Sequence, residues 1–230
     1  MKLSWLPWLS KQKIVLASAS PRRSEILSDM GLDFKIVTTL KDDANDPSAF
    51  DLKEDYVHYT ARMKAVEVFE RCRDDPSLPD ADIVIGADTV VVLDKFNVLE
   101  KPRDAEDAKR MLLELSGKKH TAMTGVVILR KSPENKPYDE MAFVTKTDVD
   151  FFEIDDGILD TYVASGEPFG KAGAYGIQGP ASLFVRGIHG DYWNVVGLPK
   201  SRLYQELLSL ENMKKEEEKM SFIIFLAHAI

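Results

Sequence analysis

The sequence has a single cysteine, Cys72, and only four histidines among its 230 residues. A lone thiol cannot form an internal disulfide, and the histidines do not cluster with it into a Cys/His metal site. Cys72 lies in a segment with helical periodicity, which favours a structural thiol over a nucleophile. The cysteine content therefore excludes a disulfide scaffold and a zinc-finger-like protein.

Long apolar runs are also missing. The most apolar stretch, residues 220–230, has eleven residues, whereas a membrane-spanning helix needs roughly 18. The N-terminus carries Trp5 and Trp8 but lacks the apolar core and small-residue cleavage site of a signal peptide. We therefore expect a soluble, cytoplasmic protein with no membrane partner.

Positive charge is in deficit, with 30 Lys and Arg against 38 Asp and Glu, a net charge of −8. Such a chain has no overall field to attract a polyanion, so we expect no nucleic-acid partner. Any phosphate site must gather its cations locally. The 44% of hydrophobic residues suffices for a packed core and excludes wholesale disorder.

Strand-like and helix-like segments alternate along the chain, which predicts an α/β fold with one domain of two lobes. The expected strands are residues 14–17, 34–38, 82–93, 121–129 and 142–152. The expected helices are residues 21–30, 51–73, 105–116, 155–164 and 199–210. We divide the chain into an N-terminal extension (1–13), the α/β domain (14–210) and a tail, charged and then apolar (211–230).

Serines and arginines gather where the first expected strand meets the first helix. Ser18 and Ser20 precede Pro21, Arg22 and Arg23, and proline at the first helical position predicts Ser20 as the N-cap. Unpaired helix N–H groups, hydroxyls and guanidinium groups together suit phosphate. A capped helix with solvated arginines is an equal alternative, and the Walker pattern is absent.

Asp88 interrupts a strand that is otherwise almost entirely apolar, and Thr89 follows it. A carboxylate in such a strand is costly to bury unless it is paired, bound to metal or used in chemistry. For a lone aspartate, a structural ion pair is the more common explanation.

Three lysines beside small residues, Lys64, Lys101 and Lys171, are further candidates, although each alone is more typical of a solvated surface. Lys64 differs because it lies close to the apolar face of its expected helix. The glycine-rich segment 166–197 would let backbone approach a ligand closely, and Gln178 within it offers an amide that both donates and accepts.

Six motifs together resemble the Maf family of nucleoside triphosphate pyrophosphatases, in the larger Maf/HAM1 group. They are Leu-Ala-Ser-Ala-Ser-Pro-Arg-Arg (16–23), Gly-Ala-Asp-Thr-Val-Val (86–91), Lys-Pro (101–102), Leu-Ser-Gly (115–117), Lys-Ala-Gly-Ala-Tyr-Gly-Ile-Gln-Gly (171–179) and Asn-Val-Val-Gly-Leu-Pro (194–199). The resemblance implies an elongated, two-lobed mixed sheet flanked by helices, with a central cleft. It also implies hydrolysis of a nucleoside triphosphate to the monophosphate and pyrophosphate with a divalent cation, Mg²⁺ or Mn²⁺, in a homodimer.

The same resemblance implies roles for individual residues. Asp88 is the expected proton acceptor and a metal ligand. The second expected metal ligand is Asp42, which stands where the family usually has a glutamate; neighbouring Asp43 could substitute. The expected phosphate ligands are Ser18, Ser20, Arg23, Lys64, Lys101 and Lys171.

Substrate preference follows from Arg22, Thr89 and Gln178, which match the branch that resembles dTTP and UTP pyrophosphatases. The branch acting on 7-methyl-GTP carries Trp, Gln and Glu there. We therefore expect hydrolysis of dTTP, UTP and modified pyrimidine nucleotides such as 5-methyl-UTP, in a pool-sanitising role. The alternatives are a 7-methyl-GTP or purine (ITP or XTP) pyrophosphatase, and a non-catalytic nucleotide-binding regulator of cell division.

Overall fold

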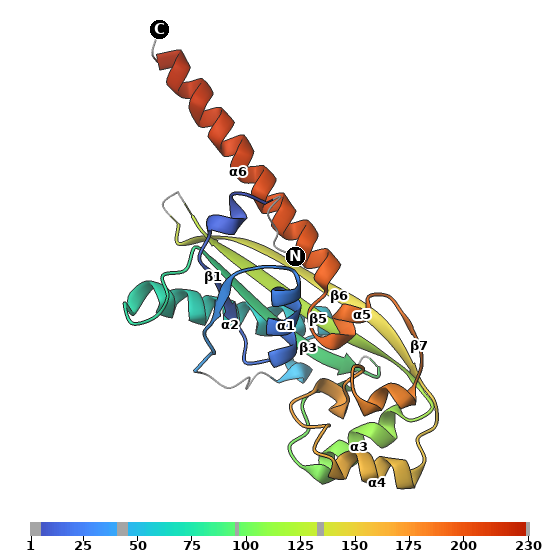
Figure 1. The fold of residues 1–230 in the computed structure, drawn as a ribbon. Coiled ribbons are helices and arrows are strands. Elements are labelled where there is room, and N and C mark those ends of the chain that lie inside the picture. Colours follow the sequence, from blue (N-terminus) through green and yellow to red (C-terminus); the bar gives the residue numbers. More distant parts are fainter. Residues whose placement is uncertain (1–5, 41–45, 95–96, 133–135, 229–230) are drawn as a thin grey trace.

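The computed structural model describes residues 6–40, 46–94, 97–132 and 136–228. Within these residues one open, mixed sheet of seven strands forms the centre of the molecule (Figure 1). The strands are β1 (Ile14–Ala17), β2 (Phe34–Ile36), β3 (Ile83–Val92), β4 (Val98–Leu99), β5 (Lys119–Lys131), β6 (Tyr138–Phe151) and β7 (Val185–His189). The α/β fold predicted from the alternation of segments is confirmed, as is the mixed sheet that the family resemblance implied.

The sheet has the order β2-β1-β3-β5-β6-β7, with β4 paired to the end of β3. β1 is parallel to both β2 and β3, whereas β3, β5, β6 and β7 form antiparallel pairs. All four residues of β1 are buried, as are nine of the ten in β3. Burial on both faces explains why these two strands are nearly continuous apolar sequence.

Helices cover both faces of the sheet. They are α1 (Pro21–Asp29), α2 (Lys53–Asp74), α3 (Ala105–Leu115), α4 (Asp156–Ala164), α5 (Tyr192–Val196) and α6 (Lys200–His228). α2 packs on the face formed by Val15, Val84 and Val127, whereas α1 and the start of α6 pack on the face of Leu16 and Ile85. In Figure 1, α3 and α4 lie together at the end of the sheet opposite the C-terminus.

Two glycines set the distance between α2 and the sheet. A Cβ on Gly86 of β3 would lie 2.6 Å from the carbonyl oxygen of Ala61, and one on Gly125 of β5 would lie 2.6 Å from that of Val57. Side chains do not tolerate such distances, so glycine is required where helix and strands meet. α2 is thereby seated directly on β3 and β5.

The expected boundaries differ from the observed ones in several places. The second strand ends at Ile36 rather than at residue 38, and the antiparallel strands β5 and β6 are longer than predicted. The glycine-rich segment contains β7, α5 and two short 3₁₀ helices that its composition did not suggest. The last helix passes residue 210 without a break and reaches His228.

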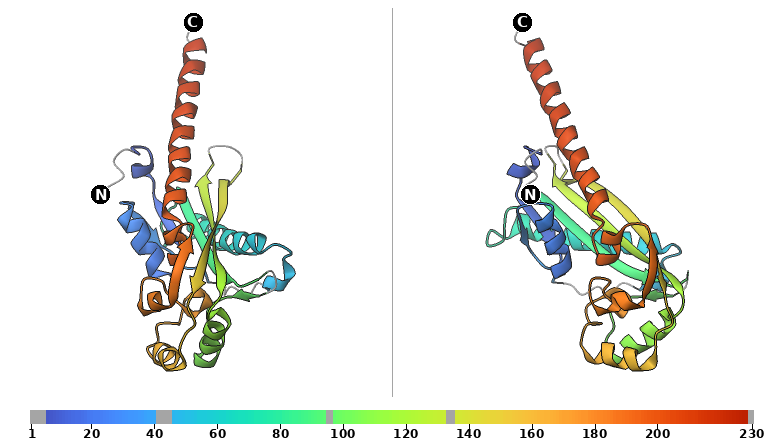
Figure 2. Two further views of the ribbon diagram at one scale, coloured as in Figure 1. Left: turned by 90° about the vertical axis from the view of Figure 1, so that its right-hand side faces the viewer. Right: turned by 45° about the vertical axis from the view of Figure 1, so that its right-hand side comes forward.

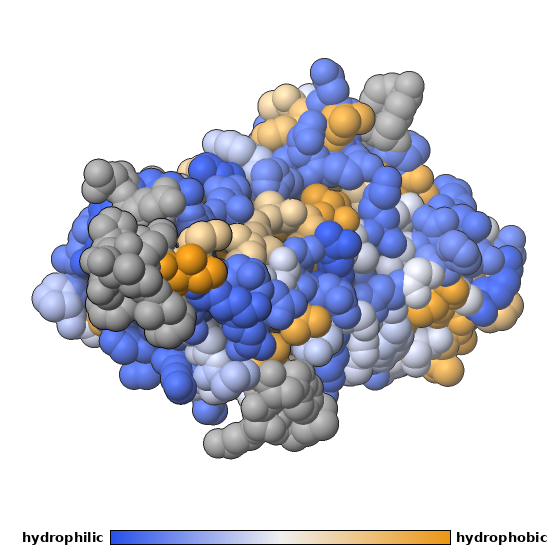
Figure 3. Space-filling model, turned by 90° about the horizontal axis from the view of Figure 1, so that it is seen from above, coloured by the Kyte–Doolittle hydropathy of each residue, from blue (hydrophilic) through white to orange (hydrophobic). Residues whose placement is uncertain are grey.

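α6 is anchored at its start and then projects from the rest of the molecule (Figure 2). Leu203, Leu207 and Leu210 are buried, and the carboxylate of Glu211 accepts a hydrogen bond of 2.9 Å from the backbone N–H of Leu9. No described helix is long and apolar enough to cross a membrane. Viewed from above, hydrophilic residues dominate the surface and hydrophobic ones form separate patches (Figure 3).

Candidate active site

A pocket of about 600 Å³ opens where the ends of β1 and β3 meet α1, α2 and the loop after α4. All of the predicted site residues that the structure describes line it. They are Ser18, Ser20, Arg22, Arg23, Lys64, Asp88, Thr89, Lys101, Lys171 and Gln178. The fold thus collects Lys64 and predicted site residues from four of the six motifs into one cavity.

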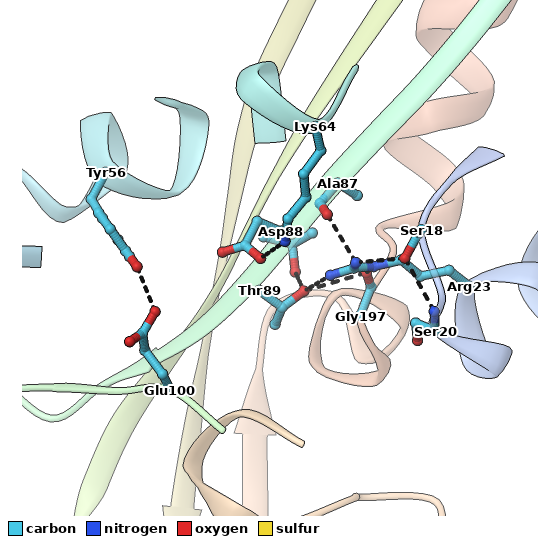
Figure 4. Close-up of polar contacts among 11 residues, drawn as sticks. Ser18, Ser20, Arg23, Tyr56, Lys64, Ala87, Asp88, Thr89, Glu100 and Gly197 are labelled. Atoms are coloured by element: carbon cyan, nitrogen blue, oxygen red, sulfur yellow. Dashed lines mark hydrogen bonds and ion pairs between the residues drawn. The ribbon is translucent and has the colours of Figure 1, made fainter. Parts of the chain in front are cut away.

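An ion pair between Lys64 of α2 and Asp88 of β3 lies in the wall of this pocket (Figure 4). The Lys64 Nζ donates to Oδ1 of Asp88 at 2.7 Å, and each side chain is only 10% exposed. The close seating of α2 at Gly86 brings the two side chains together. Asp88 is therefore paired, as burial requires, yet it borders a cavity rather than the closed core.

The turn between β1 and α1 supplies hydroxyls and backbone N–H groups. Ser20 occupies the N-cap position before Pro21, as predicted, but its side chain makes no capping hydrogen bond. The Ser18 hydroxyl accepts a hydrogen bond from the backbone N–H of Ser20 at 3.2 Å. A helix N-terminus with an uncommitted serine hydroxyl at a pocket edge is suited to an anion.

Arg23 is mostly engaged within the protein. Its guanidinium donates to the Gly197 and Ala87 carbonyl oxygens at 2.9 and 2.8 Å, and to the hydroxyls of Ser18 and Thr89 at 3.0 and 2.9 Å (Figure 4). These contacts join β1, β3 and the turn after α5. Contact with phosphate remains a prediction for Arg23, and its observed partners make it a residue that positions Ser18 and Thr89.

Arg22 and Gln178, two of the predicted specificity residues, also line the pocket. Arg22 donates from Nε to the Val196 carbonyl at 3.3 Å and from Nη2 to that of Gly170 at 3.5 Å. Burial lowers the pKa of Arg22 by disfavouring its charged form. The Gln178 side chain is exposed and makes no hydrogen bond with any described residue, so its amide can serve a ligand.

The remaining two lysines border the pocket in different states. Lys101 is exposed, whereas Lys171 is half-buried and pairs with the Glu167 carboxylate at 3.3 Å. Gly176 and Gly179 leave room for the side chains of Lys171 and Glu167, since a Cβ on Gly176 would lie 2.8 Å from Cε of Lys171. The glycine density of this segment thus serves the packing of Lys171.

Sequence reasoning missed several pocket residues. Thr38, Thr39 and Phe169 line the cavity, but nothing in their sequence context marks them. It also missed Tyr56, whose hydroxyl donates to Glu100 at 2.5 Å beside the site (Figure 4). The position of Glu100 directly before Lys101 was the available signal.

Asp42 and Asp43, the candidate second metal ligands, lie outside the described residues. Among the described residues, no group of three or more His, Cys, Asp or Glu side chains could hold a metal. Mg²⁺ commonly binds one or two carboxylates together with substrate phosphates and waters. Asp88 fits that pattern, because its Oδ2 makes no hydrogen bond with a described residue and the carboxylate borders the cavity.

Cys72 lies away from this chemistry, as predicted. It is buried in the apolar layer between α2 and the sheet, and burial raises the pKa of its thiol. A thiol with a raised pKa is a poor nucleophile at neutral pH.

Comparison with known proteins agrees with the motifs that meet in this pocket. The model of the Maf-like protein family matches residues 13–210. The chain belongs to the Maf family. This match spans the sheet, α1 to α5, the start of α6 and every pocket residue named above.

Curated Maf relatives are similar over most of the chain. A dTTP/UTP pyrophosphatase of Agathobacter rectalis is 42% identical over 207 residues, covering 86% of this chain and 97% of the relative. A dTTP/UTP pyrophosphatase of Bacillus cereus is 43% identical over 196 residues, covering 85% of this chain and 94% of the relative.

A human relative is similar to nearly the whole chain. It is a probable bifunctional dTTP/UTP pyrophosphatase/methyltransferase protein, 42% identical over 212 residues, which cover 91% of this chain. The chain spans only 34% of the length of that relative.

Proposed function

We propose that this protein hydrolyses dTTP and UTP, together with modified pyrimidine nucleotides such as 5-methyl-UTP, to the monophosphate and pyrophosphate. The observation that carries the proposal is the buried Lys64–Asp88 pair in the wall of a pocket lined by further cations. The names of the relatives at 42–43% identity support the choice of substrates.

The triphosphate is bound by groups from three elements. The N-terminus of α1 offers backbone N–H groups, and Ser18 and Ser20 add hydroxyls. Lys101 and Lys171, which also line the pocket, neutralise charge on the phosphates. Local cations therefore overcome the negative net charge of the chain.

The reaction is attack of a water oxygen on the α-phosphorus. Asp88 orients this water and accepts its proton, while the bond between the α-phosphorus and the oxygen bridging to the β-phosphate breaks. Pyrophosphate leaves with that oxygen. Lys64, which pairs with Asp88 and lines the pocket, would shift toward a phosphate oxygen when substrate binds and stabilise the charge that develops there.

A divalent cation, Mg²⁺ or Mn²⁺, would be held by Asp88, with Asp42 as the second protein ligand. When bound, it would neutralise phosphate charge and polarise the phosphoryl group.

Preference for pyrimidines is proposed to come from Gln178 and the residues around it. An exposed amide can pair with the mixed donor and acceptor edge of uracil or thymine. Arg22 supports the loop that contains Gly170, and Thr89 acts through its contact with Arg23.

We also propose that the protein has a pool-sanitising role in the cytoplasm and that it acts as a homodimer.

Pyrophosphate release from a panel of nucleoside triphosphates, with Mg²⁺ or Mn²⁺, tests this function. We expect dTTP and UTP to give the highest kcat/KM. Equal or higher values for 7-methyl-GTP, ITP or XTP would contradict the pyrimidine preference. Tight nucleotide binding without pyrophosphate release would instead favour a non-catalytic regulator.

A further inference from the structure

We propose that Phe169 is the platform on which the nucleobase stacks in this pocket. The inference rests on the proposed hydrolysis of nucleoside triphosphates and adds a specificity residue to it. Phe169 lines the same cavity as Arg22 and Gln178, and 43% of its surface is exposed. An exposed aromatic ring beside polar, ligand-facing groups is the arrangement by which proteins receive an unpaired base.

The backbone around Phe169 is held in a defined turn. Gly166 and Gly170, on either side, have φ values of +78° and +72°, a region that favours glycine. The Phe169 N–H donates to the Gly166 carbonyl at 3.3 Å, and the Gly170 carbonyl accepts from Arg22 at 3.5 Å. The ring is thus carried by a fixed turn tied to α1, rather than by a loose loop.

The other aromatic residue described in the pocket wall is unsuited to stacking. Tyr175 is only 5% exposed, and its hydroxyl pairs with Nε2 of His120 at 2.9 Å. Its ring packs edge-on against those of Phe151 and His120. Phe169, by contrast, has no ring or cation partner among the described residues, and its 43% exposure in the pocket lining leaves surface for a ligand.

Stacking and hydrogen bonding would then divide the recognition of the base. Every base has a π-face, so the Phe169 ring supplies affinity without choosing among bases. Gln178 reads the edge of the base and supplies the choice. The phosphate ligands at α1 and the lysines bind the triphosphate and not the base.

Steady-state kinetics of Phe169→Ala, Phe169→Leu and Phe169→Tyr test this role. Removing the ring should raise KM for UTP and dTTP by about 5- to 150-fold, the range found when a base-stacking aromatic is replaced by alanine. The change should fall on KM much more than on kcat. Phe169→Leu keeps apolar area but has no π-face, so it should raise KM nearly as much as Phe169→Ala does. Phe169→Tyr keeps an aromatic ring and should leave KM close to its original value.

A probe without a base separates stacking from general damage to the pocket. The inhibition constant of inorganic tripolyphosphate against UTP should not change in Phe169→Ala. Phe152→Ala is the matched control, because Phe152 is similarly exposed, at 48%, but does not line the pocket. This variant should behave as the unmodified protein does.

Two results would overturn the inference. Weaker tripolyphosphate binding in proportion to UTP would make Phe169 a packing residue of the whole pocket. A leucine variant with unchanged KM would show that apolar contact suffices. If the unmodified protein released no pyrophosphate, the proposed function would fail separately, and calorimetric binding of UTP to the same variants would still decide the role of Phe169.

Discussion

The Nζ of Lys64 lies 2.7 Å from Oδ1 of Asp88, and the two residues come from a helix and a strand that meet at a glycine. The pair is nearly withdrawn from solvent but borders the pocket. Because each charge compensates the other, the buried carboxylate has a partner at the place where a triphosphate would bind. The arriving phosphates can compete for Lys64, which would leave Asp88 to act on water.

Asp88→Asn should abolish most of the activity while the protein remains folded. The amide retains the size of the side chain but cannot accept a proton, so kcat should fall by at least about a hundredfold, the scale of a general base. Pyrophosphate release measures the loss, and circular dichroism checks the fold. Lys109→Met, which breaks an exposed ion pair with Asp160, is the control. An Asn variant with near-normal kcat would remove Asp88 from the proposed role.

Gly86→Ala should disturb the Lys64–Asp88 pair without altering either residue. The added Cβ would lie 2.6 Å from the Ala61 carbonyl oxygen and 2.7 Å from Cβ of Ala65, so α2 must move away from β3. We expect a loss of stability of roughly 1–3 kcal/mol, as for other overpacked sites, and a lower kcat. Denaturant titration and kinetics measure the two effects.

The comparison for this variant is Gly187→Ala on β7, where an added Cβ meets nothing within 4 Å. It should leave both stability and kcat close to their original values. If Gly86→Ala matched Gly187→Ala in both measurements, the close seating of α2 would not be what positions Lys64.

Local chemistry made much of the site predictable. Ser20 and Pro21 mark the start of α1, and an aspartate within an apolar strand marked Asp88 as a residue needing a partner. The sequence did not identify that partner, because the pairing depends on how closely α2 approaches β3. Lys64 was distinguished only by its position near the apolar face of its helix.

Other features depend on tertiary contacts that no local pattern encodes. The many internal partners of Arg23 come from β3 and the turn after α5, which are distant in sequence. Its motif suggested a phosphate ligand for the same reason that it suits an internal network, namely that a guanidinium donates in several directions. Phe169 carried no signal, since exposure of an aromatic ring is decided by the folded turn around it.

Gln178→Glu should change which nucleotide is preferred while stability stays the same. The Gln178 side chain is exposed and makes no hydrogen bond with a described residue, so replacing it breaks no contact there. A carboxylate cannot donate to a pyrimidine carbonyl, so kcat/KM for dTTP should fall by about tenfold or more. The ratio of kcat/KM for dTTP to that for 7-methyl-GTP is the measurement. An unchanged ratio would place Gln178 outside the base pocket.

Tyr56→Phe should weaken the binding of substrate by Lys101 and Lys171. Burial raises the pKa of Tyr56, which keeps its hydroxyl protonated as the donor to Glu100. The Glu100 carbonyl in turn accepts from the N–H of Gly173 at 3.0 Å, so this bond connects α2 with the segments that carry Lys101 and Lys171.

A hydrogen bond to a charged group contributes about 1.5–3 kcal/mol to the stability of the contact that it makes. Because the lost contact positions substrate-binding lysines, KM should rise more than kcat falls. Tyr59→Phe provides the comparison, because Tyr59 lies on the same helix but is 40% exposed. Equal effects of the two substitutions on KM would mean that the Tyr56–Glu100 bond does not position the lysines.

His120 should make the stability of the fold depend on pH between about 6.5 and 4. Burial between Phe151 and Tyr175 lowers its pKa to about 4, because it disfavours the charged imidazolium more than Asp148 and Asp150 favour it. In the unfolded chain the pKa is about 6.5. As the pH falls through this window, the unfolded state takes up a proton that the folded state does not, so stability declines, by about 3 kcal/mol in all.

Urea titrations of the unmodified protein and of His120→Gln at pH 7 and pH 5 test this linkage. Glutamine cannot titrate, so the variant should lose less stability between the two pH values, even if it is less stable at pH 7. His189→Gln, at an exposed position on β7, should retain the original dependence. If the free energy of unfolding declined equally in all three proteins between pH 7 and pH 5, carboxylates and not His120 would be responsible for the loss of stability in acid.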